Sequence, residues 1–283
     1  MLSVALLTSP GSGSVAALLA AHRTLGHRVV QLPADAVPVV VGGGRVSAGA
    51  LAGVDVVHSR LSLRALWPVQ EALEQAGTVC VNRYDALVAG RDKWACHLRL
   101  AAAGIPSPAT TLWAGDGDLH ALLESLGGWP LVVKPLDGFG GQGVALACRA
   151  ADLPAGPGLW LLQRFVADSA GSDVRVDVVD GQVVARWRRT AQADGEFRAN
   201  VALGGRETVE PADPDLDAVA VAAAKACGLT LAGVDVFATG DGWQVVEVNT
   251  NAGVLSGGEP APALDGRTVP IWHAEAVAAA AAT

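Results

Sequence analysis

The sequence predicts an α/β protein in which a small parallel sheet is followed by antiparallel strands and further helices. The chain has 283 residues, 51% of them hydrophobic, which is enough for a sizeable core in two or three packed units. Short apolar segments alternate with helix-length segments in the first third of the chain. Later, two pairs of apolar segments flank Asp-Gly turns, which are typical of β-hairpins.

The first 85 residues alternate strands and helices, as expected of a parallel αβ domain. Residues 2–7 predict a short strand, and residues 9–33 predict a turn, a helix and a second strand, which together form a βαβ unit. The remaining elements continue this pattern, with a strand or hairpin at 39–46, a strand at 54–60, a helix at 62–77 and a strand at 78–82.

The rest of the chain mixes helices with strands. A helix is expected at about 92–103, because Gly104 can cap it and two prolines follow at once. Apolar periodicity predicts two further helices near 117–126 and 214–227. The predicted hairpins span 173–190 and 231–249.

Charge and composition exclude several classes of function. The formal net charge is −8, so the chain lacks the overall positive charge expected for binding nucleic acid or an anionic membrane surface. The apolar run at the N-terminus is too short for a signal peptide and has no basic residues before it. The four cysteines are scattered without zinc-ligand spacing. We expect a cytoplasmic protein with reduced thiols.

A glycine-rich loop follows a strand that ends in a lysine, in 131-LVVKPLDGFGGQGVAL-146. Backbone N–H groups of glycines are unshielded by side chains and can surround phosphate oxygens, to which Lys134 would add a positive charge. The lysine precedes the glycines, so this is no Walker A loop. Two interpretations remain open at this point: a flexible lid over a nucleotide, or a mobile surface hairpin with a solvated lysine.

The hairpin at 231–249 aligns polar side chains on one face. With a tight loop at 240–242, Asp235 faces Glu247 and Asn249 points to the same side. Opposed carboxylates repel each other, and a divalent cation such as Mg²⁺ would remove that cost. Val234, Val236, Val246 and Val248 are expected on the opposite, buried face. The alternatives are an exposed acidic face or carboxylates paired with arginines.

Arginines concentrate between residues 175 and 198 of this acidic chain, which favours a site for anions there. In the predicted hairpin Arg186 and Arg188 share one face, and Arg189 lies on the other. Arg186 is expected to pair with a surface acid.

The order of these motifs resembles the ATP-grasp ligases, and within that superfamily the RimK-like amino-acid ligases. The resemblance extends from about residue 50 to 255. It rests on 82-NRYDALVAGRDKWACHLRLAAAGIPSP-108, 132-VVKPLDGFGGQGV-144, 162-LQRFV-166, 171-GSDVRVDVVDGQVVARWRRTA-191, 195-GEFRANVALGG-205, 233-GVDVF-237 and 247-EVNTNAG-253.

The resemblance implies a role for each matching residue. ATP phosphates would be held by Lys93 and Lys134 and covered by Gly140, Gly141 and Gly143. The adenine would bind to the backbone of Gln163, Arg164, Phe165 and Val166, with Asp173 close to the ribose. Catalytic contacts to the substrate carboxylate and the transferred phosphoryl group would come from Arg188 and Arg198, with Asn200 near the metal. The metal ligands would be Asp235, Glu247 and Asn249. Arg60 would face the substrate cleft.

The resemblance also implies an ATP-grasp fold with an N-terminal Rossmann-like pre-ATP-grasp domain at 1–87. Lobe A with the glycine-rich lid would span 88–165, and lobe B with the magnesium site would span 166–283. The cofactors would be ATP and two Mg²⁺ ions, with Mn²⁺ as an alternative ion. Relatives are commonly dimers or tetramers, so a homo-oligomer is one expectation.

The implied activity is ATP-dependent ligation of a carboxylate and an amine through an acyl phosphate, with an amino acid joined to a carboxylate or peptide. Two alternatives are an ATP-grasp kinase for a small molecule and a nucleotide-binding protein without turnover. The sequence departs from the family pattern at Thr250-Asn251-Ala252 and at Ala202-Leu203, where substrates are held. Both substrates, and whether one residue or many are added, therefore stay open.

Overall fold

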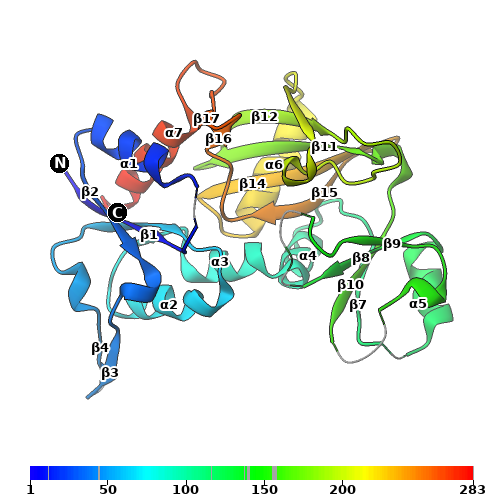
Figure 1. The fold of residues 1–283 in the computed structure, drawn as a ribbon, viewed down its shortest axis with the longest axis horizontal. Helices are drawn as coiled ribbons and strands as arrows, with labels where there is room; N and C mark the ends of the chain where they lie inside the picture. Colours follow the sequence, from blue (N-terminus) through cyan, green and yellow to red (C-terminus); the bar gives the residue numbers. More distant parts are fainter. Residues whose placement is uncertain are drawn as a thin grey trace.

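The protein folds around three main sheets that lie one after another along the molecule (Figure 1). The structure is a computed structural model. It describes residues 1–282 apart from Ser12, Gly44, Asp116, Asp137, Phe139, Gly140 and residues 155–157, and the side chain of Ala50 is not described.

The N-terminal unit is a parallel four-stranded sheet in the order β2-β1-β5-β6. Alternation of strand and helix forces this arrangement, because parallel neighbours need a crossover between them. The sequence prediction of a parallel αβ unit is therefore confirmed. Its elements are β1 (Ser3–Thr8), α1 (Val15–Thr24), β2 (Arg28–Pro33), β5 (Val56–Arg60), α2 (Trp67–Gln75) and β6 (Cys80–Val81). A small hairpin, β3 (Val40–Gly42) and β4 (Arg45–Ser47), projects from this unit (Figure 1).

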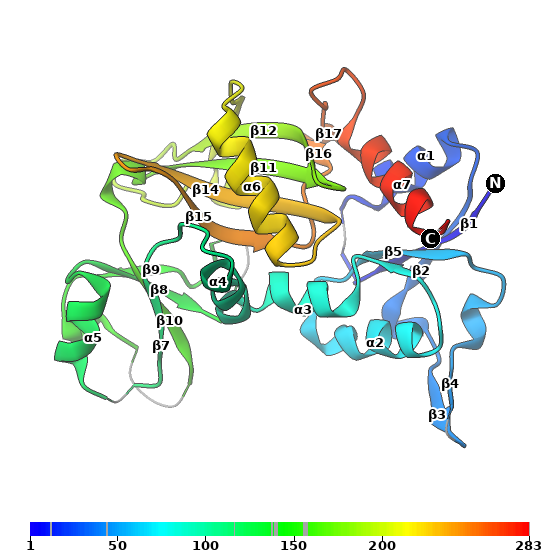
Figure 2. The ribbon, with the colours of Figure 1, turned by 180° about the vertical axis from the view of Figure 1, so that it is seen from behind.

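The C-terminal helix α7 (Val269–Ala280) packs on this N-terminal unit. Its Val269 and Val277 share a hydrophobic cluster with Leu6 and Leu18 of β1 and α1. Figure 2 shows α7 beside α1, at the opposite end of the molecule from α5 (Leu119–Leu126). The predicted elements do not include this helix. The predicted division of the chain into three units at residues 87 and 165 stays a prediction.

The second lobe in chain order, here called the middle lobe for its place in the sequence, lies at the end of the molecule opposite the N-terminal unit (Figure 1) and is an antiparallel sheet in the order β7-β10-β8-β9. Its strands are β7 (Thr110–Trp113), β8 (Leu131–Pro135), β9 (Ala145–Ala147) and β10 (Trp160–Arg164). Helix α5 (Leu119–Leu126) covers one face; it begins because Asp118 accepts hydrogen bonds from two backbone N–H groups and ends at Gly127, whose φ is +82°. Strands β8 and β9 form the hairpin that carries the glycine-rich loop.

Two helices lead into this lobe, α3 (Tyr84–Arg91) and α4 (Lys93–Ala102). The α4 prediction is confirmed, whereas α3 was not predicted. Asp92 separates the two helices and caps α4 by accepting a hydrogen bond from the backbone N–H of Ala95 at 3.0 Å. This cap places Lys93 at the first position of α4, directed at the glycine-rich loop.

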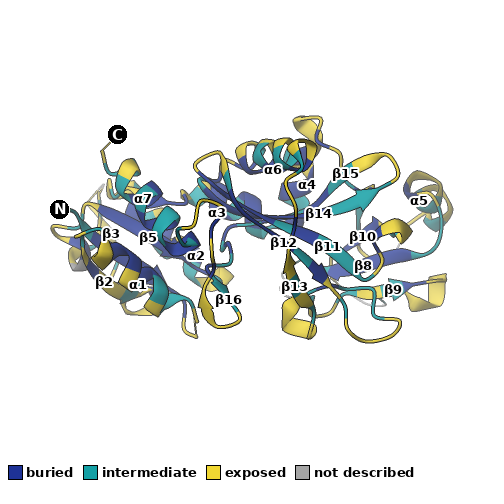
Figure 3. Ribbon diagram, turned by 90° about the horizontal axis from the view of Figure 1, so that it is seen from above, coloured by how far each residue is buried: buried dark blue, intermediate teal, exposed yellow. Residues whose placement is uncertain are grey.

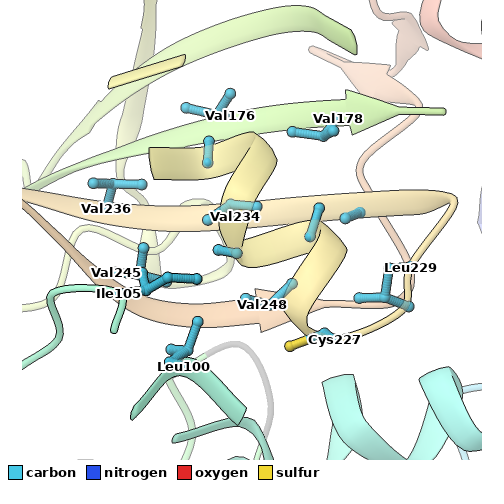
Figure 4. Packing of buried hydrophobic residues seen from close by; sticks show 14 of the residues in the cluster. Leu100, Ile105, Val176, Val178, Cys227, Leu229, Val234, Val236, Val245 and Val248 are labelled. Carbon is cyan, nitrogen blue, oxygen red and sulfur yellow. The ribbon is translucent and has the colours of Figure 1, made fainter. Parts of the chain in front are cut away.

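The largest sheet has five antiparallel strands in the order β13-β12-β11-β14-β15. They are β11 (Ser172–Val179), β12 (Gln182–Thr190), β13 (Arg206–Val209), β14 (Leu231–Thr239) and β15 (Gly242–Asn249), and a small pair, β16 (Leu255–Ser256) and β17 (Glu259–Pro260), follows. Helix α6 (Pro214–Ala226) crosses one face (Figure 2). Figure 4 shows valines of the sheet packed under α6 and beside Leu100 of α4. Full burial of each valine stabilises the fold by roughly 1.5–3 kcal/mol.

A β-bulge corrects the predicted register of the late hairpin. Asp235 pairs with Glu247 as predicted, but Val236 pairs with Val245, so Val246 is the extra residue. Val245 therefore takes the core position, and Val246 faces the opposite side of the sheet. The prediction that Val246 points into the core was wrong, because simple alternation does not hold across a bulge. The loop contains only residues 240–241.

Two buried polar side chains join the N-terminal unit to the large sheet. Asn82 accepts hydrogen bonds from the backbone N–H groups of Thr230 and Leu231 and donates to the carbonyl of Leu231. Arg60 donates to the carbonyl of Ala252 at 3.0 Å and is only 6% exposed. The prediction that Arg60 faces a substrate cleft was wrong, because its side chain connects two folded units. Figure 3 shows buried strands in both of these units, β5 in the N-terminal unit and most of β14 in the large sheet.

None of the helices in the described part of the chain combines the length and the apolarity that crossing a lipid bilayer requires.

Candidate functional site

A cleft of about 100 Å³ lies between the middle lobe and the large sheet. The middle lobe contributes residues of β8, β10 and the glycine-rich loop, and the large sheet contributes residues of β11, β14 and β15. The chain has three lysines, and two of them line this cleft, while Lys225 is exposed on α6. The predicted site residues that line it are Lys93, Lys134, Gly141, Gln163, Phe165, Val166, Asp173, Arg198, Asn200, Asp235 and Glu247.

Lys134 lies at the end of β8 with its ammonium group buried. Its Nζ donates to Oε1 of Gln163 at 2.7 Å, and the amide of Gln163 lies 3.1 Å from Nε2 of His97. Burial lowers the pKa of Lys134 to about 8, although the negative charge of Glu247 opposes the shift. The side chain is therefore a cation at neutral pH held in a site of low polarity, where an anionic ligand would stabilise the charge.

Lys93 links the start of α4 to both the loop and the large sheet. Its Nζ donates to the carbonyl oxygen of Gly138 and lies 3.6 Å from Oε1 of Glu247. Glu247 remains 27% exposed to the cleft. A cation and a carboxylate therefore meet in the cleft, and the cation also contacts the glycine-rich loop.

Asp235 lines the cleft but is nearly buried, and two arginines bind its carboxylate. Arg175 binds both of its carboxylate oxygens, at 2.5 and 3.0 Å, and Arg189 binds Oδ1 at 2.8 Å. Asn249 donates to Oδ2 at 3.2 Å. Burial alone would raise the pKa of Asp235, but the two arginines lower it to about 2. Asp173 accepts two further hydrogen bonds from Arg189.

The glycine-rich loop is held over the cleft by Arg198. The guanidinium of Arg198 donates to the carbonyls of Gly141 and Val144 at 3.1 and 3.2 Å, and it also pairs with Glu196. Gly141 has a φ of +77°, and a Cβ there would lie 2.6 Å from Oδ1 of Asn200. This close approach requires glycine and brings Asn200 directly against the loop.

Several predicted residues do not reach the cleft. Gly143 and Arg164 are not among its lining residues, and the guanidinium of Arg164 lies near Gly127 instead. Asn249 contacts Asp235 without lining the cleft. Gly140 lies outside the described residues.

The predicted placement of Arg188 in the site was wrong. Arg188 binds Glu210 through two hydrogen bonds of 2.6 Å, on the face of the sheet that also carries Arg186, which is bound to Asp217 of α6 as expected. Arg189 instead binds Asp173 and Asp235, two carboxylates that line the cleft, because alternate residues of a strand point to opposite faces. The sequence held this signal: once Arg186 is assigned to a surface acid, Arg188 must share its face.

The arrangement can bind a polyanion beside a divalent cation. Lys93, Lys134 and Arg198 provide positive charge along the cleft, and Glu247 provides an oxygen donor next to them. No group of three or more acidic, histidine or cysteine side chains suited to a metal was found among the residues that the structure describes. An ion here would need oxygens from its ligand as well, as Mg²⁺ bound with phosphates does.

Comparisons with known proteins agree with this geometry. The family model described as the RimK-like ATP-grasp domain matches residues 90–258. A probable alpha-L-glutamate ligase of Xanthomonas campestris pv. campestris is 36% identical over 277 residues, which cover 91% of this chain and 93% of the relative.

Two solved structures share the fold over nearly the whole chain. The D-alanine–D-alanine ligase of Bacillus anthracis complexed with ATP is 16% identical, with a TM-score of 0.72 over 100% of this chain and 98% of the other. The ATP-grasp ligase PsnB, complexed with a variant of its minimal precursor, Mg and ADP, is 22% identical, with a TM-score of 0.69 over 99% of both chains.

Proposed function

From the premise that this chain belongs to the RimK-like ATP-grasp family and is an ATP-dependent ligase that joins a carboxylate to an amine, we propose that it adds an amino acid to a small carboxylic acid or peptide. The observation that supports this proposal is the meeting of Lys93, Lys134 and Glu247 in one cleft beneath a glycine-rich loop. Phosphoryl transfer needs such positioned charge more than it needs a covalent nucleophile on the protein.

ATP is proposed to lie along the cleft with its phosphates toward Lys93. Phe165 and Val166 follow β10 at the apolar end of the cleft, where a base would pack. Lys134 and Lys93 would hold the phosphates from two sides. In the structure Lys93 donates to the loop carbonyl of Gly138, so the phosphates would replace that carbonyl as its partner.

Glu247 is the proposed first protein ligand of a magnesium ion in the cleft. Its carboxylate is partly exposed and forms an ion pair with Lys93 at 3.6 Å. Asp235 already accepts four hydrogen bonds, which fill the positions that a carboxylate offers, so it would have to exchange one of them for the ion. Asn249, which donates a hydrogen bond to Asp235, is the third proposed metal ligand. The ion would neutralise phosphate charge that develops during transfer.

The reaction then has two steps. A carboxylate oxygen of the acid attacks the γ-phosphorus of ATP, the bond to the β–γ bridging oxygen breaks, and an acyl phosphate and ADP form. The amine then attacks the acyl carbon, phosphate leaves, and the nitrogen loses a proton to give the amide. Arg198 can move from the loop carbonyls to the transferring phosphoryl group, where its charge is needed.

The glycine-rich loop would protect the acyl phosphate from water. Its described residues Gly138, Gly141 and Val144 line the cleft, and Asn200 and Arg198 contact it from the large sheet side. Closure over a reactive intermediate is a common use of such lids. We further propose that two magnesium ions bind, as the family resemblance implies. We also propose a cytoplasmic location and, as is common among relatives, a homo-oligomer.

The test is to incubate the purified protein with Mg-ATP, pooled amino acids and candidate carboxylates, and to separate the products by mass. ADP and phosphate accompanied by a new amide mass are expected. Lys134→Met should abolish this product, and Lys225→Met, which changes an exposed lysine on α6, should retain it. ADP with a phosphorylated acceptor and no amide would instead indicate a kinase.

A further inference from the structure

A second cavity of about 160 Å³ adjoins the proposed ATP cleft. It opens between the N-terminal unit and the glycine-rich loop, and Lys93, Gly138 and Glu247 line both spaces. The remaining lining residues come mainly from the segment after β5 and from the end of α3. A molecule in this second cavity would therefore contact the same Lys93 and Glu247 at which we place the terminal phosphate.

The charge of the second cavity is positive although the chain is acidic overall. Its charged lining residues are Arg64, Arg91 and Lys93 against Glu247, in a protein of net charge −8. An ammonium group entering this space would be repelled, and a carboxylate would be attracted. The charge thus favours the acid over the amine as the occupant.

Arg91 is the residue best placed to orient a carboxylate there. Its Nη2 donates to the carbonyl oxygen of Ser62 at 2.7 Å, which fixes the guanidinium between α3 and the loop after β5. Four of its five N–H donors are not used by that bond. Burial lowers the pKa of Arg91, and Glu247 opposes the shift. A planar, fixed guanidinium suits a carboxylate better than a lysine would.

Arg64 lines the second cavity and not the ATP cleft. It is exposed, and its guanidinium carbon lies 5.5 Å from the ring centroid of Trp67, a buried residue that also lines the cavity. Leu63 also lines the cavity. The cavity thus carries a second positive charge, from Arg64, beside apolar side chains and beyond the residues that it shares with the ATP cleft.

Resting on the proposed function, we propose that this cavity binds the acid that becomes phosphorylated, and that this acid carries a second negative charge. The reacting carboxylate lies between Arg91 and Lys93, and the second anionic group lies toward Arg64. Arg91 positions the acid for attack on the γ-phosphorus, and Arg64 selects acids with two charges. The amine approaches from outside this cavity.

The test compares acids that differ only in charge, N-acetyl-L-glutamate with N-acetyl-L-glutamine and N-acetyl-L-aspartate with N-acetyl-L-asparagine. Hydroxylamine serves as the amine, and the hydroxamate product is measured. We expect the diacids to be favoured about ten-fold or more in kcat/KM, since each lost charge-assisted hydrogen bond costs about a factor of ten. Arg64→Gln should remove this preference, and Arg91→Gln should raise KM for every acid while leaving KM for ATP unchanged.

Arg83→Gln is the matched control, because its side chain is 75% exposed and lies outside the cavity. Equal use of acid and amide analogues by the wild type, or a rise in KM for hydroxylamine rather than for the acid in Arg91→Gln, would overturn the proposal. If none of these four acids gives a hydroxamate, turnover does not test the cavity, and the ligase function is judged from the mass-based substrate screen instead. Calorimetry of N-acetyl-L-glutamate binding to the Mg-ADP complex then tests the cavity separately, and the absence of binding that depends on Arg91 refutes it.

Discussion

The neighbouring residues Arg188 and Arg189 allow one chemical change to be made on both faces of the same strand. Arg189→Gln removes the partner of two carboxylates, since Arg189 binds Asp173 at 2.6 and 2.8 Å and Asp235 at 2.8 Å. All three side chains are nearly buried, with exposures of 7%, 11% and 9%. Breaking a buried ion pair from one side costs about 3–5 kcal/mol. Total stabilities are about 5–15 kcal/mol, so the variant should fold but be markedly less stable.

Arg188→Gln is expected to behave differently. Arg188 is 36% exposed and pairs only with Glu210 among the acids of the described chain, but Glu210 is only 10% exposed, so the loss of Arg188 should cost about 1–3 kcal/mol, less than the loss of Arg189. Activity should separate the two variants further. Because Arg189 holds Asp235, a proposed metal ligand, its loss should lower Mg-ATP turnover about 10–100-fold, whereas Arg188→Gln should stay near the wild type.

Urea unfolding and ADP release, measured side by side on both variants, provide the assay. The free energy of unfolding is compared from the urea midpoints of the two variants, provided that their m-values are equal. A changed m-value would show that the substitution alters the unfolded state instead. Turnover is measured well below the urea midpoint of the weaker variant. Loss of turnover in Arg188→Gln with retention in Arg189→Gln would refute the assignment of the two faces, and equal effects would show that neither arginine positions the site.

Three further predictions concern Glu247, Lys134 and a group of buried histidines. Glu247→Ala should abolish Mg-dependent ADP release without unfolding the protein; unchanged release would contradict the metal assignment. Because burial lowers the pKa of Lys134 to about 8, ATP affinity of the free protein should fall as pH rises through 8, measured as Kd between pH 6.5 and 9.5, and a flat profile would argue against a phosphate contact. Burial also lowers the pKa values of His22 to about 4, of His273 to about 3 and of His58 well below its usual range. The unfolded chain then binds more protons below pH 6.5, so stability should be fully present above that pH and fall by up to about 1.4 kcal/mol per histidine for each pH unit below it. Equal urea midpoints at pH 7.5 and pH 5 would contradict this.

Local patterns predicted most of the elements but not how the sheets combine. Strand alternation and hairpin turns located β11, β12, β14 and β15, and the pairing of Asp235 with Glu247 followed from the same reasoning. The extra residue at Val246 could not be predicted, because a bulge leaves no mark in a run of valines. Helix α7 was missed, since its alanine-rich sequence has little amphipathic pattern and it is stabilised by packing on α1.

The contacts within the site depended on tertiary structure. No sequence pattern shows that Arg175 and Arg189 meet on Asp235, because Arg175 and Asp235 are 60 residues apart in the chain. The sequence left open whether the two carboxylates bind a metal or pair with arginines. Asp235 pairs with arginines, whereas Glu247 is partly exposed to the cleft. Arg91 likewise gained a role only when α3 and the loop after β5 came together.

The most direct test of the account follows one oxygen atom. A carboxylic acid substrate labelled with ¹⁸O in its carboxylate is incubated with Mg-ATP and the amine, and the released phosphate is analysed by mass. Attack of the carboxylate on the γ-phosphorus predicts that each phosphate carries one oxygen from the acid, so labelled phosphate should appear in step with the amide. Amide formation with unlabelled phosphate would contradict the acyl phosphate route, and with it the arrangement of acid and ATP around Lys93 and Glu247.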